Sequence, residues 1–221
     1  MVALDIMTPL SEDLTNEGLA TWNVEFRRIT MGKPESGYPG TFLDVGAAID
    51  ELRALAPVHD LDLDRVVAVG HSAGGHLALW AAARPRLPST SGIRGSDPLP
   101  LRAVVSLAGV LDLADTKARG QCGKLADKLL GGTKAQVPER YAETNPAELV
   151  PIGVPQVLVH GTADDVVPVS GSEDHHARAH AAGDRVSLTT IQDGDHFDVI
   201  TSASTKWPRV REQILALFEE E

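Results

Sequence analysis

The chain has 221 residues, of which 43% are hydrophobic and 23% charged, as is normal for a soluble globular protein. Its net charge of −11 at pH 7 argues against a nucleic-acid partner. No apolar run is long enough to span a membrane and no signal-peptide pattern is present, so we expect no membrane partner and a cytoplasmic location. The single cysteine, Cys122, excludes an intrachain disulfide and favours a reducing compartment.

Strand patterns and helix patterns alternate along the chain. The residue spacing predicts, in order, a helix at 8–16, a strand at 21–28, a helix at 41–56, strands at 65–69 and 103–107 with a helix at 76–83 between them, a strand at 156–159, a helix at 170–182, a strand at 186–191 and a helix at 207–218. This alternation is typical of βαβ units. We therefore expect one α/β domain over 1–221, with a mostly parallel sheet and helices on both faces. The long mixed stretch 110–150 is a candidate lid or cap.

The most specific motif surrounds Ser72. A short β-branched run at 66–69 leads into G-H-S-A-G (70–74), and an apolar helical pattern follows at once. A G-x-S-x-G pattern between a strand and a helix is typical of a nucleophile elbow, a tight turn that presents a serine hydroxyl above the end of a sheet. The next helix would begin at the same place, so the Ala73 N–H is a candidate oxyanion donor. A Gly-Ser turn without chemistry is the alternative interpretation.

A serine nucleophile needs a base and a carboxylate that orients the base. In proteins with a nucleophile elbow, the order along the chain is Ser, then Asp or Glu, then His. Asp164 follows the strand predicted at 156–159, and His196 follows the strand predicted at 186–191. Because parallel strands end at one edge of a sheet, Ser72, Asp164 and His196 are the candidate nucleophile, acid and base.

Other interpretations of these residues are open. Asp112 competes with Asp164 for the role of the acid, since it also follows a predicted strand. Asp164 and Asp165 are alternatively turn carboxylates that cap the helix near Ser170. His196 is alternatively one of eight histidines and without a role.

The remaining histidines are assigned no chemistry. His71 fills the variable place of the elbow, and His160 lies at a strand end, where a structural role is expected. His175, His176 and His180 resemble a metal cluster only loosely, because no H-E-x-x-H pattern or strong third ligand accompanies them, and we expect a solvated helix face. No phosphate loop or G-x-G-x-x-G pattern occurs, so no cofactor and no metal are expected.

With these motifs the chain resembles the α/β-hydrolase superfamily, in its esterase and arylformamidase (kynurenine formamidase-like) branch. The resemblance covers nearly the whole chain and rests on W-N-V-E-F-R-R (22–28), Y-P-G-T-F-L-D-V (38–45), G-H-S-A-G-G-H-L-A-L-W (70–80), A-G-V-L-D-L (108–113), H-G-T-A-D-D-V-V-P (160–168) and G-D-H-F-D (194–198). It implies a triad of Ser72, Asp164 and His196 that hydrolyses a small-molecule ester or aryl-formamide through an acyl-enzyme. A peptidase similar to prolyl oligopeptidase, or a hydrolase-like binding protein with impaired catalysis, is the alternative.

The chain departs from that superfamily at its N-terminus. Members carry an H-G-G-x-W segment that supplies further oxyanion donors, and this chain has no H-G-G. The strand before that segment would lie between the strands predicted at 21–28 and 65–69, so its absence would leave a gap in the sheet. We therefore expect that Met1 is not the natural start and that the 221-residue form is unstable, inactive or both.

Overall fold

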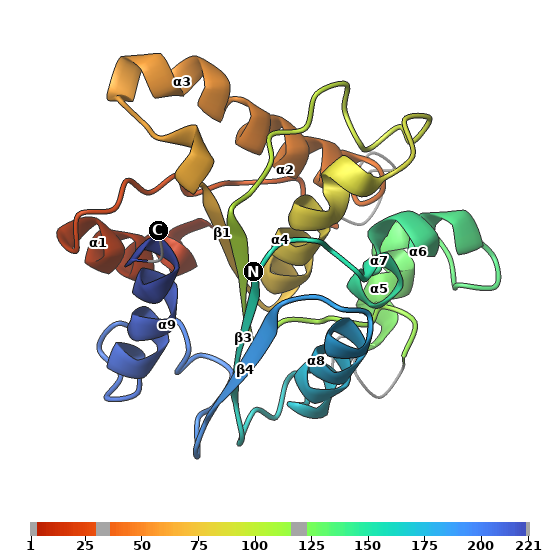
Figure 1. Ribbon diagram of the computed structural model, residues 1–221. Coiled ribbons are helices and arrows are strands. Elements are labelled where there is room, and N and C mark those ends of the chain that lie inside the picture. The colour runs from red at the N-terminus through yellow and green to blue at the C-terminus, as the bar shows by residue number, and fades with distance from the viewer. Residues whose placement is uncertain (1–3, 30–35, 116–122, 220–221) are drawn as a thin grey trace.

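A computed structural model describes residues 4–29, 36–115 and 123–219 (Figure 1). Within these residues four parallel strands form one sheet in the order β1 (Val67–His71), β2 (Ala103–Leu107), β3 (Gln156–Gly161) and β4 (Val186–Ile191). All four strands point the same way, so their carboxyl ends share one edge of the sheet. The expected parallel α/β architecture is confirmed.

Helices cover both faces of this sheet. They are α1 (Thr8–Asn16), α2 (Gly40–Asp50), α3 (Leu52–His59), α4 (Ala73–Ala83), α5 (Gly123–Leu130), α6 (Pro138–Thr144), α7 (Pro146–Leu149), α8 (Ser170–Ala181) and α9 (Trp207–Glu219), with short 3-10 turns at Leu4–Met7, Leu63–Arg65 and Arg84–Arg86. Figure 1 shows α1 and α9 on one side of the sheet and α4 and α8 on the other. Among the described residues, no helix combines the length and the hydropathy of a membrane span.

The core is divided by the sheet into two clusters. Successive side chains of a strand point to opposite faces, so Val104 and Leu158 pack in the cluster around α4. Val105 and Val159, their sequence neighbours, pack against α1 and α9. Strands that are covered on both faces lose the apolar–polar alternation, which explains the continuous apolar runs in the sequence.

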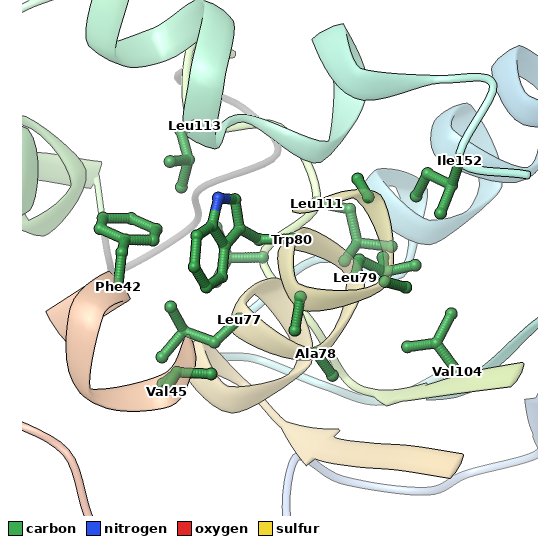
Figure 2. Close-up of a cluster of buried hydrophobic side chains, with 14 of the residues drawn as sticks. Phe42, Val45, Leu77, Ala78, Leu79, Trp80, Val104, Leu111, Leu113 and Ile152 are labelled. Carbon is green, nitrogen blue, oxygen red and sulfur yellow. The ribbon is translucent and has the colours of Figure 1, made fainter. Parts of the chain in front are cut away.

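Trp80 on α4 is a large side chain of the first cluster and is fully buried. Its ring meets the Phe42 ring edge-on with 4.9 Å between the centroids, and Figure 2 shows Leu77 beside the pair. The indole N–H donates to the carbonyl of Glu143 on α6 across 3.1 Å. These contacts join α2, α4 and α6, and they hold α4 firmly behind the turn that contains Ser72.

Residues 21–28 do not form the predicted strand. The Arg27 N–H donates to the Asp44 carboxylate across 2.8 Å, and the Thr41 hydroxyl donates to the Arg27 carbonyl across 2.6 Å. An alternating pattern produces a strand only where a neighbouring strand edge pairs with its backbone N–H and C=O groups. Here side chains of α2 form these hydrogen bonds instead. The described sheet therefore consists of β1 to β4, with β1 at one edge and without a strand from 21–28.

The helix predicted at 41–56 is also different in the structure. It divides at Glu51 into α2 and α3, and Pro57, which was expected after the helix end, lies inside α3. Val45 on α2 and Leu52 on α3 are both buried, as expected for positions seven residues apart on one helical face.

The described part of the candidate lid, 110–115 and 123–150, contains α5, α6 and α7. Leu130 and Tyr141 from this segment are fully buried in the cluster around Trp80. A lid function stays a prediction. Residues 116–122, including Cys122, lie outside the described residues.

Candidate active site

Ser72 occupies the turn between β1 and α4. Its φ of 55° and ψ of −118° are sterically unfavourable for an L-residue. A Cβ atom at Gly70 would collide with the carbonyl of Gly74, which explains the glycine at 70, whereas a Cβ atom at Gly74 would meet no heavy atom within 4 Å. The Ser72 N–H donates to the Leu107 carbonyl across 2.9 Å and fixes the turn at the carboxyl edge of the sheet. Ala73 begins α4, and helix geometry provides no intrahelical acceptor for a first-turn N–H.

Asp164 lies in the loop after β3, and its side chain is fully buried. One carboxylate oxygen, Oδ1, accepts the N–H groups of Val166 and Val167 across 2.9 and 2.8 Å. The other, Oδ2, lies 2.6 Å from Nδ1 of His196 and 3.1 Å from Nε2 of His160. Burial alone would raise the pKa of Asp164, but the hydrogen bonds from the two histidines and the two amides hold it well below its usual range. Asp164 is therefore a carboxylate at neutral pH.

His196 lies in the loop after β4 and is almost fully buried. Its Nδ1 donates to Asp164, which leaves Nε2 as the ring atom that can accept a proton. Nε2 of His71, the residue before Ser72, donates to the His196 carbonyl across 2.8 Å, and the two ring centroids are 4.6 Å apart. Burial lowers the pKa of His71 to about 4, so this neighbour is neutral at pH 7. The elbow and the His196 loop are thus in direct contact.

Other aspartates hold the loop that contains His196. Asp195 accepts the N–H groups of Phe197 and Asp198 across 2.8 and 2.9 Å. Asp198 accepts a hydrogen bond from Lys206 across 2.8 Å, which lowers its pKa to about 2. Asp195 and Asp198 thus stabilise the conformation of this loop.

Asp112 has other partners. Its Oδ1 accepts the side-chain amide of Asn145 and the N–H of Ala114, each across 2.9 Å, and its Oδ2 lies 3.5 Å from Arg178. The structure thus places Asp112 in the turn after β2, and it brings Asp164 rather than Asp112 to His196.

One alternative interpretation and one expectation about α8 are wrong. Asp164 does not cap this helix: it binds the amides two and three residues ahead in its own turn, while the helix N-cap residue, Val169, has no side-chain cap. His175 is not solvated: it is 2% exposed, and its Nε2 lies 2.9 Å from Oε1 of Gln156. His175 is buried because α8 packs on β3 and β4, which places one face of the helix in the core.

The fold and the elbow define an α/β-hydrolase-type protein. The structure is similar to that of the carboxylesterase Cest-2923 from Lactobacillus plantarum, with a TM-score of 0.75 and 20% identity over 96% of this chain and 79% of that chain. The BD-FAE family model matches residues 2–178, and the chain belongs to this family of the esterase superfamily. The arylformamidase branch stays a prediction.

Curated relatives are longer than this chain. The uncharacterized protein YfhR of Salmonella typhi is 28% identical over 194 residues, which are 87% of this chain and 60% of YfhR. The esterase LipC of Mycobacterium tuberculosis is 29% identical over 180 residues, which are 78% of this chain and 44% of LipC. The chain therefore spans about 60% of YfhR and less of LipC.

The sequence interpretation missed the contact between His160 and Asp164. One signal was available: the run V-L-V-H-G (157–161) places a histidine at the end of an apolar strand. A polar side chain that is buried in such a position almost always has a hydrogen-bond partner.

Proposed function

We propose that this protein is a serine hydrolase that cleaves carboxylic esters through an acyl-enzyme. Ser72 is the nucleophile, His196 the general base and Asp164 the carboxylate that orients it. The observation that supports this most is the 2.6 Å hydrogen bond between Asp164 and His196, at the sheet edge where the Ser72 elbow lies. Family membership agrees with ester hydrolysis.

The proposed reaction has two halves. Ser72 Oγ attacks the ester carbonyl carbon while its proton moves to Nε2 of His196, and the resulting oxyanion accepts a hydrogen bond from the Ala73 N–H. The carbon–oxygen bond to the alcohol then breaks, and His196 returns the proton to the leaving alcohol. Water repeats the sequence on the acyl-enzyme and releases the acid. Asp164 stays ionised throughout and stabilises the positive charge on His196.

The test uses the full chain and substrates of three chemical classes. The purified protein is incubated with p-nitrophenyl acetate and butyrate, with N-formyl aniline and with a chromogenic peptide amide. Under this proposal the chain turns over esters and a fluorophosphonate labels Ser72, as located by peptide mass spectrometry, and this result would contradict the expectation that the 221-residue form is inactive. An unlabelled Ser72 in a folded protein without ester turnover would overturn the proposal. A preference for the formamide or the peptide would redirect the substrate class.

A further inference from the structure

We propose that His160 is a positioning residue that holds the Asp164 carboxylate in the orientation that His196 requires. The inference rests on the proposed function, since it concerns the same acid. It assigns a role to a buried histidine that takes no part in the reaction steps above.

The hydrogen bonds of Asp164 are divided evenly between its two oxygens. Two backbone N–H groups occupy Oδ1, and the two histidines share Oδ2. The side chains of Asp164 and His160 both have 0% exposure, so water does not substitute for any of these donors. His160 is therefore one of the two side chains that contact Oδ2, the oxygen that accepts the hydrogen bond from His196.

The neighbours of His160 determine which ring nitrogen carries the proton. Nε2 lies 2.9 Å from the Val167 carbonyl and 3.1 Å from the Asp164 carboxylate. Both groups only accept hydrogen bonds, so Nε2 is the donor. Nδ1 lies 2.8 Å from Oγ of Ser172, a buried hydroxyl on α8. The single N–H of Nε2 serves the Val167 carbonyl and lies beside the Asp164 carboxylate, so a series of polar contacts runs from α8 through His160 and Asp164 to His196.

This series of contacts also fixes the loop that contains Asp164. His160 belongs to β3, and its contact with the Val167 carbonyl closes residues 161–167 against the end of that strand. Without the imidazole, Oδ2 of Asp164 would keep one unsatisfied buried acceptor site, and the carboxylate would lose one of two donors that set its rotation. The Asp164–His196 hydrogen bond would then loosen, while groups that bind substrate would be unchanged. We therefore expect loss of the imidazole to lower kcat and to leave KM nearly unchanged.

The experiment compares substitutions of two buried histidines. His160→Phe keeps a ring but removes both donor and acceptor, while His160→Gln places an amide N–H near the position of Nε2. His175→Phe is the matched control, because His175 is also buried and hydrogen-bonded but contacts Gln156 instead of the acid. Ser172→Ala removes the hydroxyl behind the ring. Each variant is measured for kcat and KM with p-nitrophenyl acetate and for the free energy of unfolding in urea.

We expect His160→Phe to lower kcat by about 10- to 100-fold, less than a general base itself contributes. KM should stay within about twofold, His160→Gln should recover most of kcat, and Ser172→Ala should lie between His160→Phe and the unaltered chain. His175→Phe should lose stability but keep kcat. The proposal is overturned if kcat of both His160→Phe and Ser172→Ala stays near that of the unaltered chain, if His160→Gln is as slow as His160→Phe, or if His175→Phe loses kcat equally.

A second readout separates this proposal from the proposed function. The proton between Nδ1 of His196 and Asp164, whose heavy atoms are 2.6 Å apart, should give a downfield proton NMR resonance. We expect it to shift upfield or broaden in His160→Phe and Ser172→Ala but not in His175→Phe. If the unaltered folded chain hydrolyses no ester, the proposed function fails, and the resonance still decides the role of His160. An unchanged resonance in both His160→Phe and Ser172→Ala would overturn the positioning role.

Discussion

The main chain of Gly161 passes so close to Gly194 that a Cβ atom at Gly161 would lie 2.6 Å from the Gly194 carbonyl carbon. Gly161 ends β3 shortly before Asp164, and Gly194 lies two residues before His196. The Ala163 N–H donates to the Gly194 carbonyl across 2.9 Å. The loops that contain Asp164 and His196 are therefore in direct backbone contact, in addition to the hydrogen bond between the two side chains, and a side chain at Gly161 would separate them.

We expect Gly161→Ala to lower both stability and activity. Overpacking at this contact should cost about 1–3 kcal/mol of unfolding free energy, and displacement of the loops should reduce kcat at least tenfold. Gly92→Ala is the control, because no heavy atom lies within 4 Å of a Cβ there. Urea unfolding and ester hydrolysis measure the two effects. Equal behaviour of the two variants would show that the contact has room for a methyl group.

Ser72→Ala should remove nearly all hydrolysis while the fold is kept. Loss of a nucleophile typically costs about 10³-fold or more in turnover. Ser91→Ala, which loses the contacts of its hydroxyl with Glu143 and with the Ile93 N–H, should keep full activity and full fluorophosphonate labelling. If Ser72→Ala retained a tenth of the original turnover, Ser72 would not be the nucleophile.

Asp164→Asn should reduce kcat far more than Asp112→Asn. The amide of an asparagine at 164 would present N–H groups to the two histidine donors, and His196 would lose the charge that stabilises its cation. Asp112 binds Asn145 and a backbone amide, so its loss should affect mainly stability. Side-by-side assays of the two variants decide this prediction, and the opposite ranking would assign the acid to Asp112.

Activity should rise with pH, because His196 must be neutral to accept the Ser72 proton. Asp164 stays ionised over the measured range, since its pKa is held well below its usual value. The measurement is kcat/KM for an uncharged ester between about pH 5 and 8. A flat profile would contradict the assignment of His196 as the base.

Stability should fall as the pH is lowered from about 6.5 to 4, in part through His76. Burial lowers the pKa of His76 to about 4, and its Nε2 lies 2.8 Å from the Thr144 carbonyl. The unfolded chain binds a proton at this residue near pH 6.5 and the folded chain only near pH 4, so acid favours the unfolded state. The contribution of His76 to the free energy of unfolding is fully present above about pH 6.5. Below that pH it is lost at up to about 1.4 kcal/mol per pH unit.

His76→Gln tests this prediction, since it keeps a donor for the Thr144 carbonyl but does not titrate. Urea midpoints at pH 7, 6, 5 and 4 should decline less steeply for this variant than for the unaltered chain. Parallel declines would show that His76 does not contribute.

Features that depend on near neighbours in the chain could be predicted from the sequence. The elbow at Ser72 is such a feature, because the strand, the tight turn and the helix that present the serine are consecutive. The strands that precede Asp164 and His196 were also recognisable. V-L-V (157–159) is a continuous apolar run, which marks a strand covered on both faces, and V-S-L-T (186–189) alternates apolar and polar residues, which marks a partly exposed strand. Parallel strands end at one edge, and this rule alone brought the two loops to the same place.

Only the tertiary structure decided which groups satisfy the polar atoms at that edge. Residues 21–28 have the alternation of a strand, yet α2 takes their hydrogen bonds, because pairing depends on which surface lies alongside. Asp112 and Asp164 both follow a strand, and only the course of each loop brought Asp164 to His196. The contact of His160 depends on α8 and on the return of its own loop. Most buried polar groups have a hydrogen-bond partner, but the packing of segments far apart in the chain determines which partner it is.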